Sequence, residues 1–217
     1  MKKQINNLEM GIDSSLSYCS LTVFKNQKIL WNKSVKADFG HEQKLAKLLQ
    51  DCVQELKISP KNIAFLHLNH GPARFTAIRN CHALVKGFFL NHPVKIFNYN
   101  IFEHYFLGFD KVPTKKTICV LDTNRRDLAL QEINPKGKLI GKTDTYKIDE
   151  SLKSLLQKDV IIMGNGILKL KSMSEFKFLK AKECGPIHLK SDFFVQKFYD
   201  KKPKPNISKI IYPYAPI

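Results

Sequence analysis

Histidine is the residue type in this chain most suited to metal chemistry, but the spacing of the histidines does not support a metal site. A zinc hydrolase needs two histidines on one helix face and a further ligand. His67 and His70 lie three apart at a predicted strand end, where alternate residues face opposite sides. His82 and His92 lie ten apart on a predicted helix. The five cysteines are odd in number and widely spaced, as is typical of reduced core thiols. We therefore predict no metal in this chain.

The chain also lacks the other common catalytic motifs. The sequence has no Walker lysine loop, no nucleophile elbow and no pair of carboxylates at a usable site. Phosphoryl transfer depends on positioned metal ions and on charges that stabilise the transferred group. The sequence therefore predicts that the isolated chain hydrolyses no ATP and has no catalytic residues of its own.

The segment from His70 to Arg79 is the most informative stretch. It follows the apolar run Ile63–Leu68, which predicts a buried strand, and it opens a run with helical spacing of apolar residues. Gly71 and Pro72 mark the start of a helix on steric grounds. Free amide groups at such a start can hold an anion. The alternative is that the Gly-Pro pair only ends a loop.

Two amphipathic helices are predicted around this strand. The first, His41–Lys57, has one wide apolar face. The second, Ala73–Asn91, has two apolar stripes. One stripe consists of Phe75, Ile78, Val85 and Phe89, and the other of Ala77, Cys81, Leu84 and Phe88. A helix that packs on a sheet and is otherwise exposed to water needs only one stripe. The second helix therefore has one apolar stripe more than such packing requires.

The remaining pattern predicts an α/β protein with two lobes. The expected elements are an antiparallel meander (8–13, 18–24 and 29–34), a strand (94–97), a helix (100–107), three further strands (117–122, 128–133 and 160–163) and a short helix (191–200). The charged loop 108–116, with Pro113, separates the lobes. We therefore divide the chain into domains 1–110 and 111–217.

The glycine-proline stretch resembles the signature Gly-Pro-Gly-Ser-Phe-Thr-Gly-x-Arg of the TsaB family, also called YeaZ. That family is the bacterial subunit needed to make threonylcarbamoyladenosine in tRNA. The chain keeps five signature residues, namely Gly71, Pro72, Phe75, Thr76 and Arg79. It departs from the signature at three positions, where Ala73, Arg74 and Ala77 replace Gly, Ser and Gly. The resemblance covers residues 8–133 well and the rest loosely.

The resemblance implies a reduced actin-like ATPase (RNase H-like) fold with two similar lobes, mixed sheets and a smaller second lobe. In the ATPases of this fold, the matching residues lie near metal, phosphate and adenosine. Here the matching, nucleotide-proximal positions are Asp13, Ser14, Asp122, Gly164 and Gly166. The alternative for Asp13 is a carboxylate that caps a turn, and for the Gly-x-Gly a loop that needs positive φ.

The resemblance also implies a noncatalytic subunit of a tRNA threonylcarbamoyltransferase complex. A TsaD-like subunit would hold the metal and perform the transfer, with a TsaE-like ATPase as a further partner. ATP and metal are thus expected in the partner subunits and no cofactor in this chain. The partner-binding residues would be His41, Leu45, Leu48, Arg74, Phe75, Ala77, Ile78, Cys81, Leu84 and Phe88. Without its partner, the chain is expected to form a homodimer through this surface.

The net charge of +17 over 217 residues favours polyanions, because neutralising phosphates releases counterions. Lys201, Lys202 and Lys204 are candidates for contact with tRNA in the complex; the alternative is a lysine-rich but inert surface. No long apolar span and no signal peptide are present, so the cytoplasm is expected and a membrane is not. Two other functions stay open, namely a small ATPase or kinase of the same fold and a free-standing RNA-binding protein.

Overall fold

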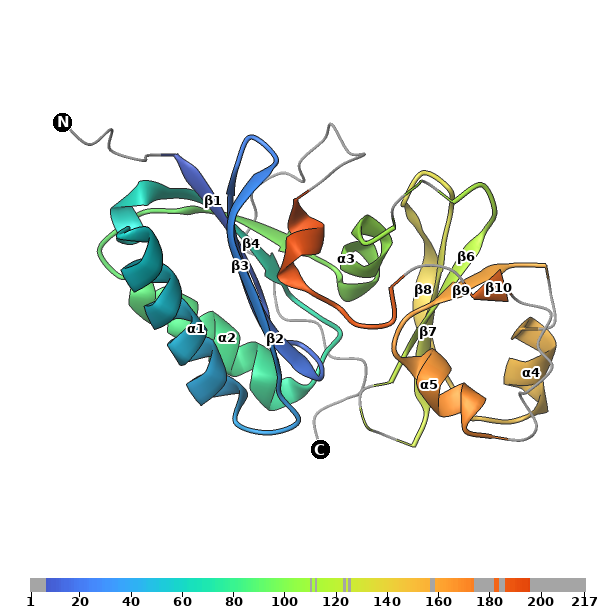
Figure 1. Ribbon diagram of the computed structural model, residues 1–217. Coiled ribbons are helices and arrows are strands. Elements are labelled where there is room, and N and C mark those ends of the chain that lie inside the picture. Colours follow the sequence, from blue (N-terminus) through green and yellow to red (C-terminus); the bar gives the residue numbers. More distant parts are fainter. Residues whose placement is uncertain are drawn as a thin grey trace. The chain divides into compact units, whose positions relative to one another are not determined.

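The computed structural model describes residues 7–195 apart from 110, 112, 123, 125, 157–158, 174–181 and 184–185. The chain divides into two compact units (Figure 1). Among the described residues, the first unit comprises residues 7–100 and 190–195, and the second comprises residues 101–189. The division therefore falls ten residues earlier than the expected boundary after residue 110. In addition, a segment near the C-terminus returns to the first unit.

The first unit contains a five-stranded sheet in the order β3-β2-β1-β4-β5. Its strands are β1 (Leu8–Asp13), β2 (Tyr18–Lys25), β3 (Lys28–Lys36), β4 (Ile63–Asn69) and β5 (Lys95–Tyr99). The first three strands pair antiparallel, whereas β4 and β5 run parallel to β1. The predicted meander is thus confirmed. Because β1 and β4 are parallel, both strands end at the same edge of the sheet.

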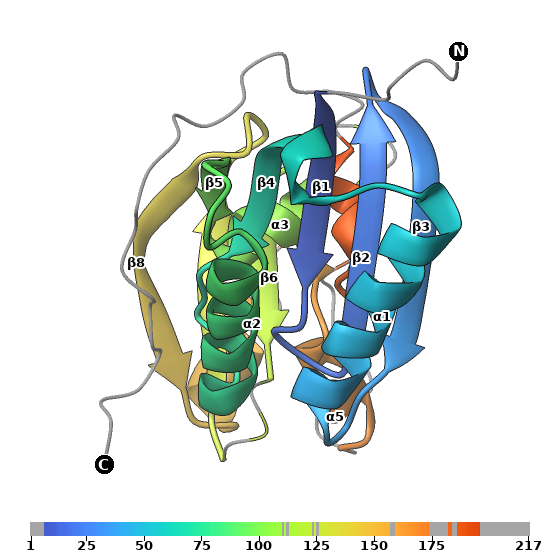
Figure 2. The same cartoon turned by 90° about the vertical axis from the view of Figure 1, so that its left-hand side faces the viewer.

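Two helices, α1 (His41–Leu56) and α2 (Phe75–Phe88), lie side by side over one face of this sheet (Figure 2). A single-turn 3-10 helix, η1 (Pro60–Asn62), leads into β4. Alternate strand residues such as Met10, Leu21 and Leu66 meet the apolar faces of the helices in one core. At the rim, Glu55 of α1 accepts a 2.8 Å hydrogen bond from the Trp31 indole of β3.

The other face of the first sheet is covered by η3 (Ser191–Phe194). The Ser191 amide donates to the Ser20 hydroxyl at 2.8 Å, and the Ser191 and Thr22 hydroxyls lie 2.8 Å apart. The Phe194 ring lies 4.9 Å from that of Tyr99, between centroids. These contacts attach the returning segment to the first unit.

The second unit has a sheet in the order β10-β9-β6-β7-β8 and three helices. Its elements are α3 (Ile101–Leu107), β6 (Thr117–Leu121), β7 (Leu128–Ile133), β8 (Leu139–Tyr146), α4 (Glu150–Leu156), β9 (Ile161–Met163), α5 (Gly166–Lys171) and β10 (Lys182–Glu183). The strands β6, β7 and β8 are antiparallel, and β9 runs parallel to β6. This unit thus repeats the first in shortened form, with three residues in β9 and two in β10. The predicted actin-like fold with a reduced second lobe is confirmed.

Several expectations fall on residues that the structure leaves undescribed. Of the helix expected over 191–200, residues 191–194 form η3 and residues 196–200 lie outside the described part. Lys201, Lys202 and Lys204 also lie outside it, as does the C-terminal tail. Within the described part, no helix combines the length and the apolar character needed to cross a membrane.

Candidate functional site

Asp13 ends β1 and organises the turn that follows it. Its side chain is 1% exposed, and its Oδ1 accepts a 2.7 Å hydrogen bond from the Ser15 hydroxyl and a 3.4 Å one from the Asn69 amide. Burial raises the pKa of Asp13 to about 6, although the hydrogen bonds with Ser15 and Asn69 act in the opposite direction. The next residue, Ser14, is also buried and donates to the Ala77 carbonyl of α2 at 3.3 Å. Both predicted nucleotide-proximal side chains therefore take part in the packing of this turn.

The connection from β4 to α2 is bound to the same turn. The Asn69 side-chain oxygen accepts from the Gly71 amide at 2.9 Å, and Gly71 has a φ of 104°, which favours glycine. The Arg74 amide donates to the Ser15 carbonyl at 3.2 Å, and its guanidinium reaches the Asp38 carbonyl at 3.2 Å. Three loops at one edge of the sheet are thus held together by the residues around Gly71.

His70, which precedes α2, and His82, in the middle of that helix, are neighbours. His70 is 9% exposed, and its buried Nδ1 has no hydrogen-bond partner among the described residues. Desolvation, with a smaller contribution from the neighbouring His82, lowers the pKa of His70 to about 4. Desolvation also lowers the pKa of His82, whose Nε2 lies 3.2 Å from the Asn69 carbonyl. Both rings are therefore neutral at physiological pH.

In the second unit, Asp122 and the Gly-x-Gly come together at the end of β6. The Asn165 side chain accepts from the Asp122 amide at 3.0 Å and donates to the Asp122 carbonyl at 2.7 Å. The Asp122 carboxylate accepts from the Asn124 amide at 2.8 Å and lies 3.7 Å from the Lys169 ammonium. Unlike Asp13, this carboxylate keeps 18% of its side-chain surface exposed.

The two glycines of this turn are explained by close packing on β6. A Cβ at Gly164 would lie 2.4 Å from the Val120 carbonyl oxygen, and Gly164 has a φ of 102°. A Cβ at Gly166 would lie 2.7 Å from a methyl carbon of Val120. The backbone of this turn thus approaches β6 so closely that a side chain would have to displace it. The open alternative for the Gly-x-Gly, a loop that needs positive φ, fits Gly164.

The expected outward stripe of α2 is corrected by the structure. Six of the predicted partner-binding side chains are less than 10% exposed, namely His41, Leu45, Leu48, Ala77, Ile78 and Cys81. Leu84 and Phe88 are partly buried and pack against the same core. Arg74 connects loops, and Phe75 begins α2. The small residues Ala77 and Cys81 let α2 approach the turn after Asp13, so that this stripe faces inward.

The outward faces of the two helices are polar and contain small residues. They comprise Glu42, Gln43, Ala46, Lys47, Gln50 and Gln54 of α1, and Thr76, Arg79, Ala83 and Gly87 of α2. The Asn80 amide of α2 donates to the Glu42 carboxylate of α1 at 3.3 Å, which connects the helices on this side. We call these residues the outer helix face.

Sequence reasoning missed several residues that hold the turns. Ser15 and Asn69 bind Asp13, and Asn165 binds the backbone of Asp122. Each lies directly after a predicted strand, which is the signal that could have identified it. Among the described residues, no group of three or more His, Cys, Asp or Glu side chains could hold a metal ion. What the described polar residues do at these edges is position loops.

Comparison with known proteins identifies relatives over most of the chain. No protein-family model matches it. The chain is 23% identical over 190 residues to the tRNA threonylcarbamoyladenosine biosynthesis protein TsaB of Buchnera aphidicola subsp. Schizaphis graminum, which covers 84% of this chain and 90% of that protein. It is 22% identical over 158 residues to the protein of the same name from Buchnera aphidicola subsp. Acyrthosiphon pisum, with 72% and 68% covered.

Two solved structures from Pseudomonas aeruginosa share the fold. One is an uncharacterized protein with similarity to peptidase YEAZ, with a TM-score of 0.67, 14% identity, and 87% and 88% of the two chains covered. The other is YeaZ, with a TM-score of 0.63, 12% identity, and 87% and 89% covered.

Proposed function

We propose that this chain, which is a divergent member of the TsaB/YeaZ family, is a noncatalytic subunit required for threonylcarbamoylation of the adenosine beside the tRNA anticodon. The observation that carries the proposal is the similarity to two curated TsaB proteins, one of which is matched over 90% of its length. In this role the chain organises a TsaD-like catalytic subunit. That subunit, with a TsaE-like ATPase, supplies the metal and ATP chemistry.

The geometry at the strand ends supports a role in assembly. Asp13 and Ser14 are buried and hydrogen-bonded within their turn, which favours a packing role over contact with a nucleotide. The Asp122 turn is organised by Asn165 through two backbone hydrogen bonds. The polar residues that an ATPase of this fold would use are thus occupied in positioning loops.

The outer helix face is the surface we assign to the partner. Ala46, Ala83 and Gly87 leave room for close approach by the helices of another subunit, as in a four-helix layer. This assignment replaces the buried stripe of Ala77 and Cys81. In the absence of the partner, the same face joins two copies of the chain in a homodimer.

A bulky charge on this face tests the assignment. Ala83→Arg should abolish co-elution with a TsaD-like subunit and convert a homodimer to monomers, because a long side chain prevents close helix packing. Ala83 is exposed, so thermal unfolding should be unchanged. Ser154→Arg, at an exposed position of α4 in the second unit, is the matched control and should assemble normally. Wild-type assembly of a folded Ala83→Arg protein would show that this face is not the interface.

A cellular assay tests the function itself. A bacterium depleted of its TsaB protein should regain threonylcarbamoyladenosine in its tRNA when it expresses this chain with a cognate TsaD-like subunit. Mass spectrometry of digested tRNA gives the measurement. A chain that binds the TsaD-like subunit but restores no modified nucleoside would contradict the proposed function.

A further inference from the structure

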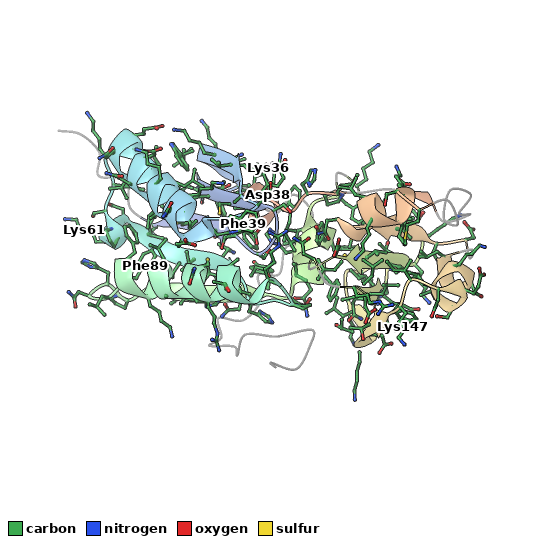
Figure 3. The ribbon with its side chains drawn as sticks, turned by 90° about the horizontal axis from the view of Figure 1, so that it is seen from below. Lys36, Asp38, Phe39, Lys61, Phe89 and Lys147 are labelled. Carbon is green, nitrogen blue, oxygen red and sulfur yellow. The ribbon has the colours of Figure 1, made fainter. Side chains whose placement is uncertain are left out.

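One end of the first unit collects lysines from five separate elements. Because α2 runs antiparallel to β4, the end of α2 lies where β1, β4 and β5 begin. The turn between β2 and β3 and the end of α1 lie at this end too. The exposed lysines there are Lys28, Lys57, Lys61, Lys86 and Lys95, and the partly buried Lys25 lies opposite Lys28. We call the five exposed lysines the basic end; Figure 3 shows Lys61 and Phe89 there.

The five lysines of the basic end share one feature, which is that they lack ion pairs within the described part of the chain. None of the five has a carboxylate partner among the described residues. By contrast, eight lysines elsewhere do, namely Lys33, Lys36, Lys47, Lys115, Lys116, Lys153, Lys169 and Lys171. Unpaired lysines such as Lys44 and Lys142 also occur elsewhere in the described chain, but the five at this end come together from separate elements.

Two carboxylates at this end of the first unit, Glu9 at the start of β1 and Glu55 near the end of α1, are already engaged. Glu9 is 9% exposed, and its Oε2 lies 3.0 Å from His67 Nε2. Glu55 accepts from Lys33 at 2.5 Å and from the Trp31 indole. Neither carboxylate is placed to neutralise the lysines of the basic end. The end therefore presents an uncompensated positive field to a partner.

The width of the basic end suits a nucleic-acid backbone. Lys28 begins β3 and Lys95 begins β5, which are the two outer strands of the sheet. Five strands at about 4.8 Å spacing span about 19 Å. A nucleic-acid strand carries a phosphate about every 3.4 Å along a duplex axis, so this width reaches about five phosphates. Lys95 also lies over the Phe65 ring, 5.9 Å from its centroid, which holds that ammonium group in position.

We propose that the basic end of the first unit binds the phosphate backbone of RNA and, in the complex, contacts the substrate tRNA. The choice of tRNA as the RNA rests on the proposed function, whereas the site rests on the unpaired charges. The five lysines contact phosphates and therefore contribute affinity and orientation without reading base sequence.

The test compares two triple variants with equal loss of charge. In the first, Lys28, Lys61 and Lys95 of the basic end are changed to Gln. In the second, the ion-paired Lys115, Lys153 and Lys171 are changed to Gln. Binding of the full chain to a tRNA transcript is measured from 50 to 200 mM salt. Each lost phosphate contact should reduce the slope of log K against log salt by roughly 0.7 to 0.9.

The first variant should therefore lower the slope by roughly two to three and the affinity by at least about tenfold at physiological salt, while the second stays within about twofold of wild type. Equal losses in both variants would overturn the proposal, because net charge alone would then explain binding. Leu90, 79% exposed beside Lys86, makes anionic lipid the competing partner. The proposal would also be overturned if the first variant lost binding to phosphatidylserine vesicles but retained its affinity for tRNA.

The proposed function can fail separately from this inference. If the first variant loses tRNA affinity but the wild-type chain restores no threonylcarbamoyladenosine in the depleted cell, the RNA site stands and the proposed function does not. If the wild-type chain restores the nucleoside and the first variant binds tRNA with an unchanged salt slope, the function stands and the RNA site does not.

Discussion

The contributions of Asp13 and His70 to stability change in opposite directions with pH, although both residues lie at the same edge of the first sheet. Burial raises the pKa of Asp13 to about 6, so its contribution to stability is complete below pH 3.8 and is lost as pH rises through 6. Burial lowers the pKa of His70 to about 4, so its contribution is present above pH 6.5 and is lost as pH falls through 4. Between pH 4 and 6 the two effects largely cancel.

When either residue is replaced, the pH dependence of the free energy of unfolding should show the titration of the other residue alone. In Asp13→Asn, the free energy of unfolding should fall more steeply than in wild type as pH decreases from 6.5 to 4, because only the unfolded chain then gains the His70 proton. In His70→Gln, acidification over the same range should cost less stability, since Asp13 takes up its proton in the folded state. Urea denaturation at a series of pH values measures both slopes. Parallel curves for the wild type and both variants would contradict these assignments.

At the scale of elements, α2 has an inner and an outer face, and residues of the two faces lie only two positions apart along the chain. Cys81 is 4% exposed, and burial raises the pKa of its thiol to about 12. Ala83 lies on the outer helix face and is exposed. The same substitution at the two positions therefore tests which stripe belongs to the core.

Cys81→Glu should destabilise the protein by about 3 kcal/mol or more, because it places an unpaired charge in the core. Ala83→Glu should change the free energy of unfolding by less than about 0.5 kcal/mol, as is usual for exposed surface positions. Denaturant midpoints give the comparison. A stable Cys81→Glu protein would mean that the stripe of Ala77 and Cys81 faces outward after all.

At the scale of the whole chain, the returning segment is held where Gly11 lacks a side chain. A Cβ at Gly11 would lie 2.7 Å from a ring carbon of Phe194 and 2.9 Å from the Ser191 carbonyl oxygen. The segment that follows the second unit can therefore cover β1 only because that strand has a glycine at this position.

Gly11→Ala should cost about 1–3 kcal/mol through overpacking and should speed hydrogen exchange at the amides of η3. Gly87→Ala is the matched control, since nothing lies within 4 Å of its added Cβ and alanine favours a helix by up to about 1 kcal/mol. Thermal unfolding and hydrogen exchange measure the two variants. Unchanged exchange at residues 191–195 in Gly11→Ala would contradict the described attachment.

Much of the fold could be predicted from local pattern. A continuous apolar run located β4, helical periodicity located the core face of α1, and Gly71 with Pro72 marked the turn before α2. The orientation of α2 could not be predicted in the same way. Alanine and cysteine are small enough for a close helix-sheet contact and equally for a contact between subunits, so Ala77 and Cys81 carried no decisive signal.

By itself, the sequence determined the elements and the family resemblance, because periodicity and turn chemistry act between residues close along the chain. Only the tertiary structure decided what those elements contact. The bond from Asn69 to Asp13 joins residues 56 positions apart, and that between Thr22 and Ser191 joins residues 169 apart. The tertiary structure also brings together the lysines of the basic end from five elements, none of which contains a run of lysines. Contacts of this kind depend on how the chain returns on itself, which local sequence does not encode.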